Sequence, residues 1–211
     1  MIISVSFTNF KNSQKETIEL INQSKADYLH IDLFDGKFVP TKQQQPVELN
    51  KLLSSIKKPL DVHLMAEKPL SYLEYFANLN TDYFVFHYEV VKDILEAISR
   101  VKETGIKVGI AIHLSTEVEN LKPYLHLLDQ VLIMSAEGGY GGASFNPIAL
   151  EKISELKALK EENGYHYLIN VDCGINAETI NLVREAGADM VVSGSYICMS
   201  DDIQGAIDSL R

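Results

Sequence analysis

The sequence has only two cysteines in 211 residues, Cys173 and Cys198, which are too few for a disulfide framework and fit a reducing compartment. It has no run that approaches 18 consecutive apolar residues, so a membrane-spanning helix is not expected. A strand-like pattern starts at Ile2, which leaves no room for a signal peptide. These absences predict a cytoplasmic protein that does not insert into a membrane.

Basic side chains are scarce as well. The chain has 19 lysines and arginines against 29 aspartates and glutamates, for a formal net charge of -10. We therefore expect neither nucleic acid nor an anionic membrane surface as a partner, although a local phosphate pocket is compatible with this charge. The remaining composition, 46% hydrophobic and 23% charged, is that of a globular protein with a sizeable core.

No proline-, glycine- or serine-rich linker divides the chain. Short β-branched or aromatic runs alternate instead with longer amphipathic stretches, and Gly105, Gly164 and Gly187 stand where three of the predicted helices end. The predicted strands are residues 2–6, 28–34, 60–65, 83–87, 107–112, 130–134, 167–171 and 190–193. The predicted helices include residues 15–24, 92–104, 147–162 and 177–186.

This alternation is typical of α/β proteins with a parallel sheet, which is either open and doubly wound or closed into a barrel. No Gly-x-Gly-x-x-Gly sequence follows the first predicted strand, which counts against the dinucleotide-binding form of the open sheet. Eight strands in this length leave about 26 residues for each strand and its crossover, which suits a parallel arrangement. We therefore predict a (β/α)8 TIM barrel that forms a single catalytic domain over residues 1–211.

Four reactive side chains fall late in three predicted strands, with the parity that faces the interior of a barrel. His30 and Asp32 are two residues apart in one strand, and His63 lies late in the next. Asp172 comes at the end of the seventh strand, and barrel active sites form where such strand ends meet. Two imidazoles and two carboxylates suit one divalent ion such as Zn²⁺, Fe²⁺, Mn²⁺ or Co²⁺. Taken singly, such a histidine is more often structural, and Asp172 could cap the following helix.

A glycine-rich segment, residues 137–142, follows the sixth predicted strand. Four glycines in these six residues let backbone N–H groups approach an anion closely. Gly174 lies after the seventh strand, and Gly194 and Ser195 lie after the eighth, where barrels frequently hold phosphate. The alternative is a flexible lid without a ligand, but the neighbouring Gly194 favours a phosphate site.

Seven segments together resemble the ribulose-phosphate 3-epimerases and related ketose-phosphate 3-epimerases over essentially the whole chain. Their order and spacing make the resemblance specific. The segments are VSF at 5–7, HIDLFDGKFVP at 30–40, DVHLM at 61–65, FHYE at 86–89, MSAEGGYGG at 134–142, VDCGI at 171–175 and SGS at 193–195.

The resemblance implies roles for the matching residues. His30, Asp32, His63 and Asp172 correspond to the metal ligands. Asp32 and Asp172 also correspond to the acid/base pair that removes the C3 proton of the ketose from one face and returns one to the other, through a metal-stabilised enediolate. The implied substrate contacts are Ser6, His63, Met65, Met134, Gly139, Tyr140, Gly141, Gly142, Asp172, Cys173, Gly174, Gly194 and Ser195.

The sequence departs from the family pattern around the sugar but at no metal ligand. Phe34 stands where a third methionine is usual, and Cys173 replaces the first glycine of Asp-Gly-Gly. These differences do not change the predicted reaction, but they leave open which sugar is the substrate. The other departures are Gly138 for proline, His113-Leu114 for Asn-Pro, and residues 41–45 for a stretch that usually starts with asparagine.

The resemblance favours interconversion of D-ribulose 5-phosphate and D-xylulose 5-phosphate, and we expect a homo-oligomer. The same reaction on a six-carbon ketose phosphate such as allulose 6-phosphate is one alternative, because the departures surround the sugar. A non-catalytic sugar-phosphate-binding barrel is another. Related phosphate-binding decarboxylases are disfavoured, since His63 stands where their Asp-x-Lys-x-x-Asp array has lysine.

Overall fold

The computed structural model describes residues 1–7, 10–39, 49, 53, 56–136 and 142–211. Within these residues eight parallel strands pair in chain order, and β8 pairs with β1, so that the sheet closes into a barrel. This arrangement confirms the predicted TIM barrel. The strands are β1 (Ile2–Ser6), β2 (Tyr28–Phe34), β3 (Leu60–Met65), β4 (Thr81–His87), β5 (Lys107–Ile112), β6 (Gln130–Met134), β7 (Leu168–Asp172) and β8 (Met190–Ser193).

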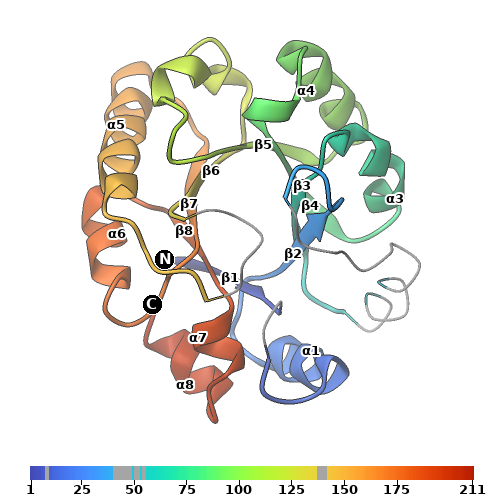
Figure 1. Cartoon of the computed structure of the whole chain (residues 1–211), viewed down its shortest axis with the longest axis vertical. Helices are drawn as coiled ribbons and strands as arrows, with labels where there is room; N and C mark the ends of the chain where they lie inside the picture. Colours follow the sequence, from blue (N-terminus) through green and yellow to red (C-terminus); the bar gives the residue numbers. More distant parts are fainter. Residues whose placement is uncertain (8–9, 40–48, 50–52, 54–55, 137–141) are drawn as a thin grey trace.

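Helices surround the strands, as Figure 1 shows. Gly164 and Gly187 take the left-handed conformation at the ends of α5 and α6, as the sequence predicts. In the described part of the chain, no helix is both long enough and apolar enough to cross a bilayer. The α-helices are α1 (Gln14–Gln23), α3 (Leu73–Ala77), α4 (Ile94–Glu103), α5 (Ile148–Asn163), α6 (Ile180–Ala186), α7 (Ser195–Cys198) and α8 (Ile203–Asp208), and the 3-10 helices are η1 (Pro69–Tyr72), η2 (Tyr88–Val90), η3 (Val118–Leu121) and η4 (Leu125–Leu127).

Two predicted strands were wrong by one or two residues. β4 begins at Thr81 rather than at residue 83, because an irregularity in its pairing with β3 between Leu60 and Asp61 admits one extra residue. β7 runs one residue later than predicted, because Asp172 still pairs with Met134 on β6. Asp172 therefore belongs to the strand itself, and the pairing fixes its level at the end of the barrel.

The alternation of side chains along each strand separates two environments. On β2, Leu29, Ile31 and Leu33 belong to the apolar layer between the strands and the helices. Inside the barrel, His30 of β2 and Ser4 of β1 both hydrogen-bond to Asp61 of β3, while β4, β5, β6 and β8 contribute a separate buried apolar cluster. These buried polar groups lie directly below the carboxyl ends of the strands and give the site its base.

Candidate active site

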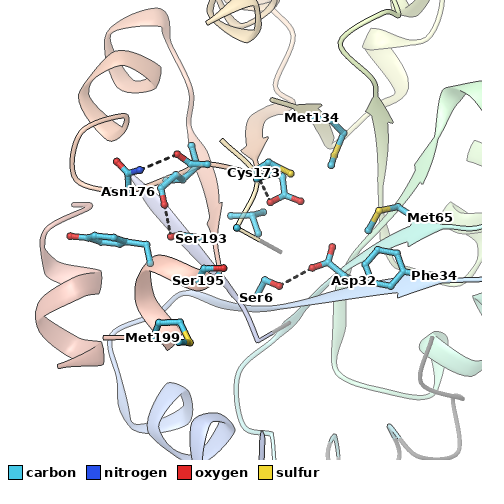
Figure 2. A pocket seen from close by; sticks show the side chains of 18 residues that line it. Ser6, Asp32, Phe34, Met65, Met134, Cys173, Asn176, Ser193, Ser195 and Met199 are labelled. Carbon is cyan, nitrogen blue, oxygen red and sulfur yellow. Dashed lines mark hydrogen bonds between the residues drawn. The ribbon is translucent and has the colours of Figure 1, made fainter. Parts of the chain in front are cut away.

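A cavity of about 420 Å³ opens at the carboxyl ends of the strands. Figure 2 shows Phe34, Met65 and Asp32 on one side of it, and Asn176, Ser195 and Met199 on the opposite side. The sequence-predicted residues that line it are Ser6, Asp32, Met65, Met134, Gly142, Asp172, Cys173, Gly174, Gly194 and Ser195. The predicted contacts Gly139, Tyr140 and Gly141 lie outside the described residues, as do Gly138 and residues 41–45.

The four predicted metal ligands lie close together, and Asp32 and Asp172 line the cavity, whereas the completely buried His30 and His63 do not. One donor atom from each of His30, Asp32, His63 and Asp172 lies within 4.8 Å of the donor atoms of the other three. Asp32 Oδ1 is 3.2 Å from His30 Nε2 and 3.3 Å from His63 Nδ1. Asp172 Oδ2 is 3.9 Å from the same nitrogen of His63. Two imidazole nitrogens and two carboxylate oxygens facing one point are a donor set that fits a divalent metal ion.

Neighbouring hydrogen bonds orient the two aspartates. Ser6 Oγ donates to Asp32 Oδ2 at 2.7 Å, which leaves Oδ1 of Asp32 facing the two imidazoles. The backbone N–H of Cys173 donates to Asp172 Oδ1 at 2.6 Å, which leaves Oδ2 facing His63. Asp172 does not cap a helix, because α6 begins at Ile180. The capping alternative for Asp172 is therefore wrong.

Asp61 is a buried part of the site to which the sequence analysis assigned no role. Its Oδ2 accepts hydrogen bonds from His30 Nδ1 at 2.7 Å and from Ser4 Oγ at 2.9 Å. Burial acts to lower the pKa of His30, but Asp32 and Asp61 outweigh it and raise that pKa well above its usual value in the metal-free protein. In the neutral ring that ligates a metal, a proton held on Nδ1 by Asp61 would leave the lone pair on Nε2. The signal was present in the sequence, because Asp61 stands two residues before His63 and so shares its face of β3.

His87 and Glu89 form a second group without an assigned role. His87 ends β4, its Nε2 lies 2.9 Å from Nε2 of His63, and its Nδ1 lies 3.0 Å from Glu89 Oε2. Burial lowers the pKa of His87 to about 4. The segment FHYE was recognised in the sequence as part of the family pattern, but strand parity does not reveal a contact between two different strands.

The two aspartates differ in their affinity for a proton. Burial disfavours the charged form of Asp32, but His30 and His63 outweigh it and hold the pKa of Asp32 well below its usual value. Burial and the neighbouring charge of Asp32 raise the pKa of Asp172 to about 6. In the metal-free protein one carboxyl is therefore ionised while the other titrates near neutrality, a division that acid/base pairs exploit.

The loops after β7 and β8 bring backbone to the other end of the cavity. Gly174 has φ 65°, and a Cβ there would lie 2.3 Å from the backbone nitrogen of Phe145, so packing alone requires glycine. At Gly194 a Cβ would lie 3.1 Å from the carbonyl oxygen of Ser6. Cys173 adopts φ 75°, a conformation that favours glycine, which is the residue that the family pattern has there. Burial and the charges of Asp172 and Asp32 raise the pKa of the Cys173 thiol, which therefore stays protonated.

Comparison with known proteins decides the family. The sequence model described as the "Ribulose-phosphate 3 epimerase family" matches residues 1–198. The chain belongs to this family. It is therefore an isomerase of the epimerase type that acts on a carbohydrate.

Two relatives show how far the likeness extends. The ribulose-phosphate 3-epimerase of Helicobacter pylori (strain J99) is 38% identical over 193 residues, which cover 92% of this chain and 89% of that protein. The ribulose-phosphate 3-epimerase of Bacillus subtilis (strain 168) is 36% identical over 211 residues, which cover 100% of this chain and 95% of that protein. Membership of the epimerase family thus rests on almost the full length of both sequences.

Solved structures of other barrels are similar in fold. The 3-hexulose-6-phosphate synthase of Salmonella typhimurium has a TM-score of 0.69 at 15% identity, with 100% of this chain and 96% of that chain covered. The phosphoribosyl anthranilate isomerase of Thermus thermophilus has a TM-score of 0.69 at 14% identity, with both chains fully covered at 100%. At such identities the likeness shows the barrel alone, and function must be argued from the site.

Proposed function

We propose that the chain inverts C3 of a ketose phosphate and that its substrates are D-ribulose 5-phosphate and D-xylulose 5-phosphate. The observation that carries the proposal is the placement of Asp32 and Asp172 on β2 and β7, with one oxygen of each facing Nδ1 of His63. Inversion through a planar intermediate needs a proton carrier on each face, and two convergent carboxylates supply them. The names of the relatives support the choice of a pentulose phosphate.

In this mechanism Asp32 and Asp172 exchange roles with the direction of the reaction. One carboxylate removes the C3 proton, which the adjacent ketone makes acidic, and the other carboxyl delivers a proton from the opposite side. Ser6 holds Asp32 through a hydrogen bond of 2.7 Å, so that the carboxylate keeps its orientation when its protonation changes. In the metal-free protein the pKa of Asp32 is held well below its usual value and that of Asp172 is raised to about 6, so the two carboxyls already differ in proton affinity before an ion binds.

We further propose that His30, Asp32, His63 and Asp172 hold one divalent ion, which is Zn²⁺, Fe²⁺, Mn²⁺ or Co²⁺. Asp61 supports the assignment, because its hydrogen bond to Nδ1 of His30 directs the other ring nitrogen at the cluster. When bound, such an ion supplies Lewis-acid stabilisation of negative charge on substrate oxygens.

The substrate would lie across the cavity, with its phosphate toward the β7 and β8 loops. Gly142, Gly174, Gly194 and Ser195 line that end, where backbone N–H groups can approach an anion. Phe34, Met65 and Met134 line the other side, where apolar surface excludes water from the reacting carbons (Figure 2).

The test is an assay on a panel of ketose phosphates, with the metal content of the same preparation measured in parallel. We expect the two pentulose 5-phosphates to interconvert, with deuterium from the solvent entering at C3. Faster turnover of a six-carbon ketose phosphate such as allulose 6-phosphate would show that the proposed substrate is wrong. The proposed inversion at C3 would then still hold. Tight binding of a sugar phosphate with no exchange of its C3 proton would contradict catalysis and favour a binding protein.

A further inference from the structure

Three imidazoles form a column at the carboxyl ends of β3, β4 and β5. The ring centroids are 5.0 Å apart for His63 and His87, and 4.6 Å apart for His87 and His113. Phe38 packs against two rings of the column, at 4.8 Å from the middle ring, His87, and 5.4 Å from His113. His63 and His87 are completely buried, so their ring nitrogens form hydrogen bonds with groups of the protein rather than with bulk solvent.

The position of the proton on His87 follows from its partners. Glu89 accepts hydrogen bonds from the backbone N–H of His113 and the hydroxyl of Thr116 through Oε1, and it faces His87 Nδ1 through Oε2. Burial acts to raise the pKa of Glu89, but these hydrogen bonds outweigh it and lower the value to about 2. An ionised carboxylate only accepts hydrogen bonds, so the proton of neutral His87 lies on Nδ1.

The ring nitrogen of His63 that carries the proton is then determined as well. Nε2 of His63 lies 2.9 Å from Nε2 of His87, and a hydrogen bond between two ring nitrogens contains one proton. Since His87 has its proton on Nδ1, its Nε2 accepts and His63 donates. A neutral His63 with its proton on Nε2 has its lone pair on Nδ1, the atom that lies 3.3 Å from Asp32 and 3.9 Å from Asp172 and that would ligate a metal ion.

We propose that Glu89 and His87 are positioning residues that set the tautomer and ring orientation of His63 for metal ligation. The inference deepens the proposed function, because it rests on the four-residue metal centre assigned there. The series of contacts runs from the Glu89 carboxylate through the rings of His87 and His63 to Nδ1 of His63, which faces Asp32 and Asp172. Glu89 and His87 fix the proton position of His63 in the way that the buried Asp61 fixes the proton position of His30.

A different use of the same residues is a second metal ion held by His87, Glu89 and His113, whose donor atoms also lie within 4.8 Å of one another. An ion on Nδ1 of His87 would move the proton of that ring to Nε2. His87 would then donate to His63, whose own proton would have to lie on Nδ1 and block ligation at the first site. The three hydrogen bonds that Glu89 accepts favour the positioning role.

Metal affinity of the full-length protein tests the role, with Zn²⁺ as the probe in competition against a chromophoric chelator. His87→Leu removes the acceptor for His63, and Glu89→Ala removes the group that orients His87, so we expect each to weaken the first Zn²⁺ by about 10- to 100-fold. His87→Gln should restore affinity, because its side-chain carbonyl can accept from His63. His113→Asn is the matched control, since it removes a ring of the column but keeps the backbone N–H that binds Glu89, and it should bind Zn²⁺ as the wild type does.

Proton positions in the unaltered protein give a second measurement that does not depend on any variant folding. In Zn²⁺-loaded protein labelled with ¹⁵N at histidine, NMR should find a proton on Nε2 of His63 and on Nδ1 of His87. A proton on Nε2 of His87 overturns the proposal. So does binding of two Zn²⁺ per chain with one lost in His113→Asn, or unchanged affinity in folded His87→Leu. Absence of epimerase activity in the wild type, with one Zn²⁺ and the expected protons, would overturn the proposed function instead.

Discussion

Oδ2 of Asp61 lies 2.7 Å from Nδ1 of His30, and both side chains are completely buried inside the barrel. A buried carboxylate beside an imidazole fixes which ring nitrogen carries the proton, and here it leaves Nε2 facing Asp32. Asp61 therefore orients one of the four residues of the proposed metal centre.

Asp61→Asn should weaken metal binding without unfolding the barrel. The amide is nearly isosteric but has no charge, so His30 loses a charge-assisted hydrogen bond, and we expect affinity for Zn²⁺ to fall by about 10- to 100-fold. Chelator competition measures the affinity, and circular dichroism checks the fold. The control is Asp82→Asn, which removes a carboxylate that binds Tyr28 and Lys107 instead of the cluster. Equal affinity in Asp61→Asn and wild type would contradict the role of Asp61.

The convergence of the four side chains of the proposed metal centre could be predicted, because it follows from strand parity and from the meeting of strand ends in a barrel. Residues two apart in a strand share a face, so the pairs 30/32 and 61/63 could be placed inside a barrel from the sequence. The contact between His63 and His87 could not, because it depends on the register of β3 against β4. That register places His63 level with Val85, two residues before His87, and it contains an irregularity that no local pattern reveals.

The left-handed backbone at Cys173 was also beyond prediction from residue type, since cysteine rarely adopts it. Its origin is visible only in three dimensions. Cys173 connects the end of β7 to Gly174, which packs against Phe145. The carbonyl oxygen of Cys173 accepts a hydrogen bond from the hydroxyl of Ser135. The family pattern, which has glycine at this position, was the one signal in the sequence.

Cys173→Gly should be more stable than Cys173→Ala. Both variants lose the thiol, so the comparison isolates the backbone, which has φ 75° at this residue. A left-handed conformation costs a residue with a Cβ about 1 to 2 kcal/mol, so we expect the glycine variant to have the higher free energy of unfolding by about 1 kcal/mol. Urea denaturation of the two variants measures the difference. A more stable alanine variant would show that the loop relaxes and that the strain is not retained.

Gly194→Ala should weaken the binding of phosphorylated sugars and leave metal binding unchanged. A Cβ at this position would lie 3.1 Å from the carbonyl oxygen of Ser6 and displace the loop after β8. Loss of one hydrogen bond to a charged group corresponds to a rise in KM of about 10-fold or more. The control is Gly105→Ala, which strains a left-handed backbone position (φ 81°) away from the cavity but where a Cβ meets nothing within 4 Å, so it shows the effect of backbone strain alone. Equal weakening of phosphorylated and unphosphorylated ligands would show that this loop does not bind the phosphate.

The stability of the metal-free protein should depend on pH through His87. Its pKa is about 4 in the folded chain, mainly because of burial, against the usual 6.5. Between these values the unfolded chain binds more protons, so stability falls as the pH drops from 6.5 to 4, by about 3 kcal/mol from this residue. His87→Gln lacks this contribution and should lose correspondingly less stability over the same range. Urea denaturation at several pH values, with chelator present, measures both proteins, and parallel profiles would contradict the prediction.

Substitution of the two aspartates that face His63 tests the proposed mechanism most directly. Asp32→Asn and Asp172→Asn should each abolish net epimerisation, because each removes the proton carrier on one face of the substrate. General acid–base groups contribute about 10²- to 10⁴-fold each, so the loss should be at least of that order. Both residues also belong to the proposed metal centre, so the metal content of each variant must be measured beside its activity.

Exchange of the C3 proton in deuterated water then distinguishes the two aspartates. The variant that keeps the base for one epimer should still exchange the C3 proton of that epimer without inverting it, since removal and return occur on the same face. The other variant should show the opposite preference, which assigns each carboxylate to its side. A substrate that is held in place cannot readily change the face that it presents to a single base, as a one-base mechanism requires. If a metal-loaded Asp32→Asn or Asp172→Asn protein epimerised at the wild-type rate, that aspartate would not be an acid/base group, and inversion by proton transfer on two faces would have to be abandoned.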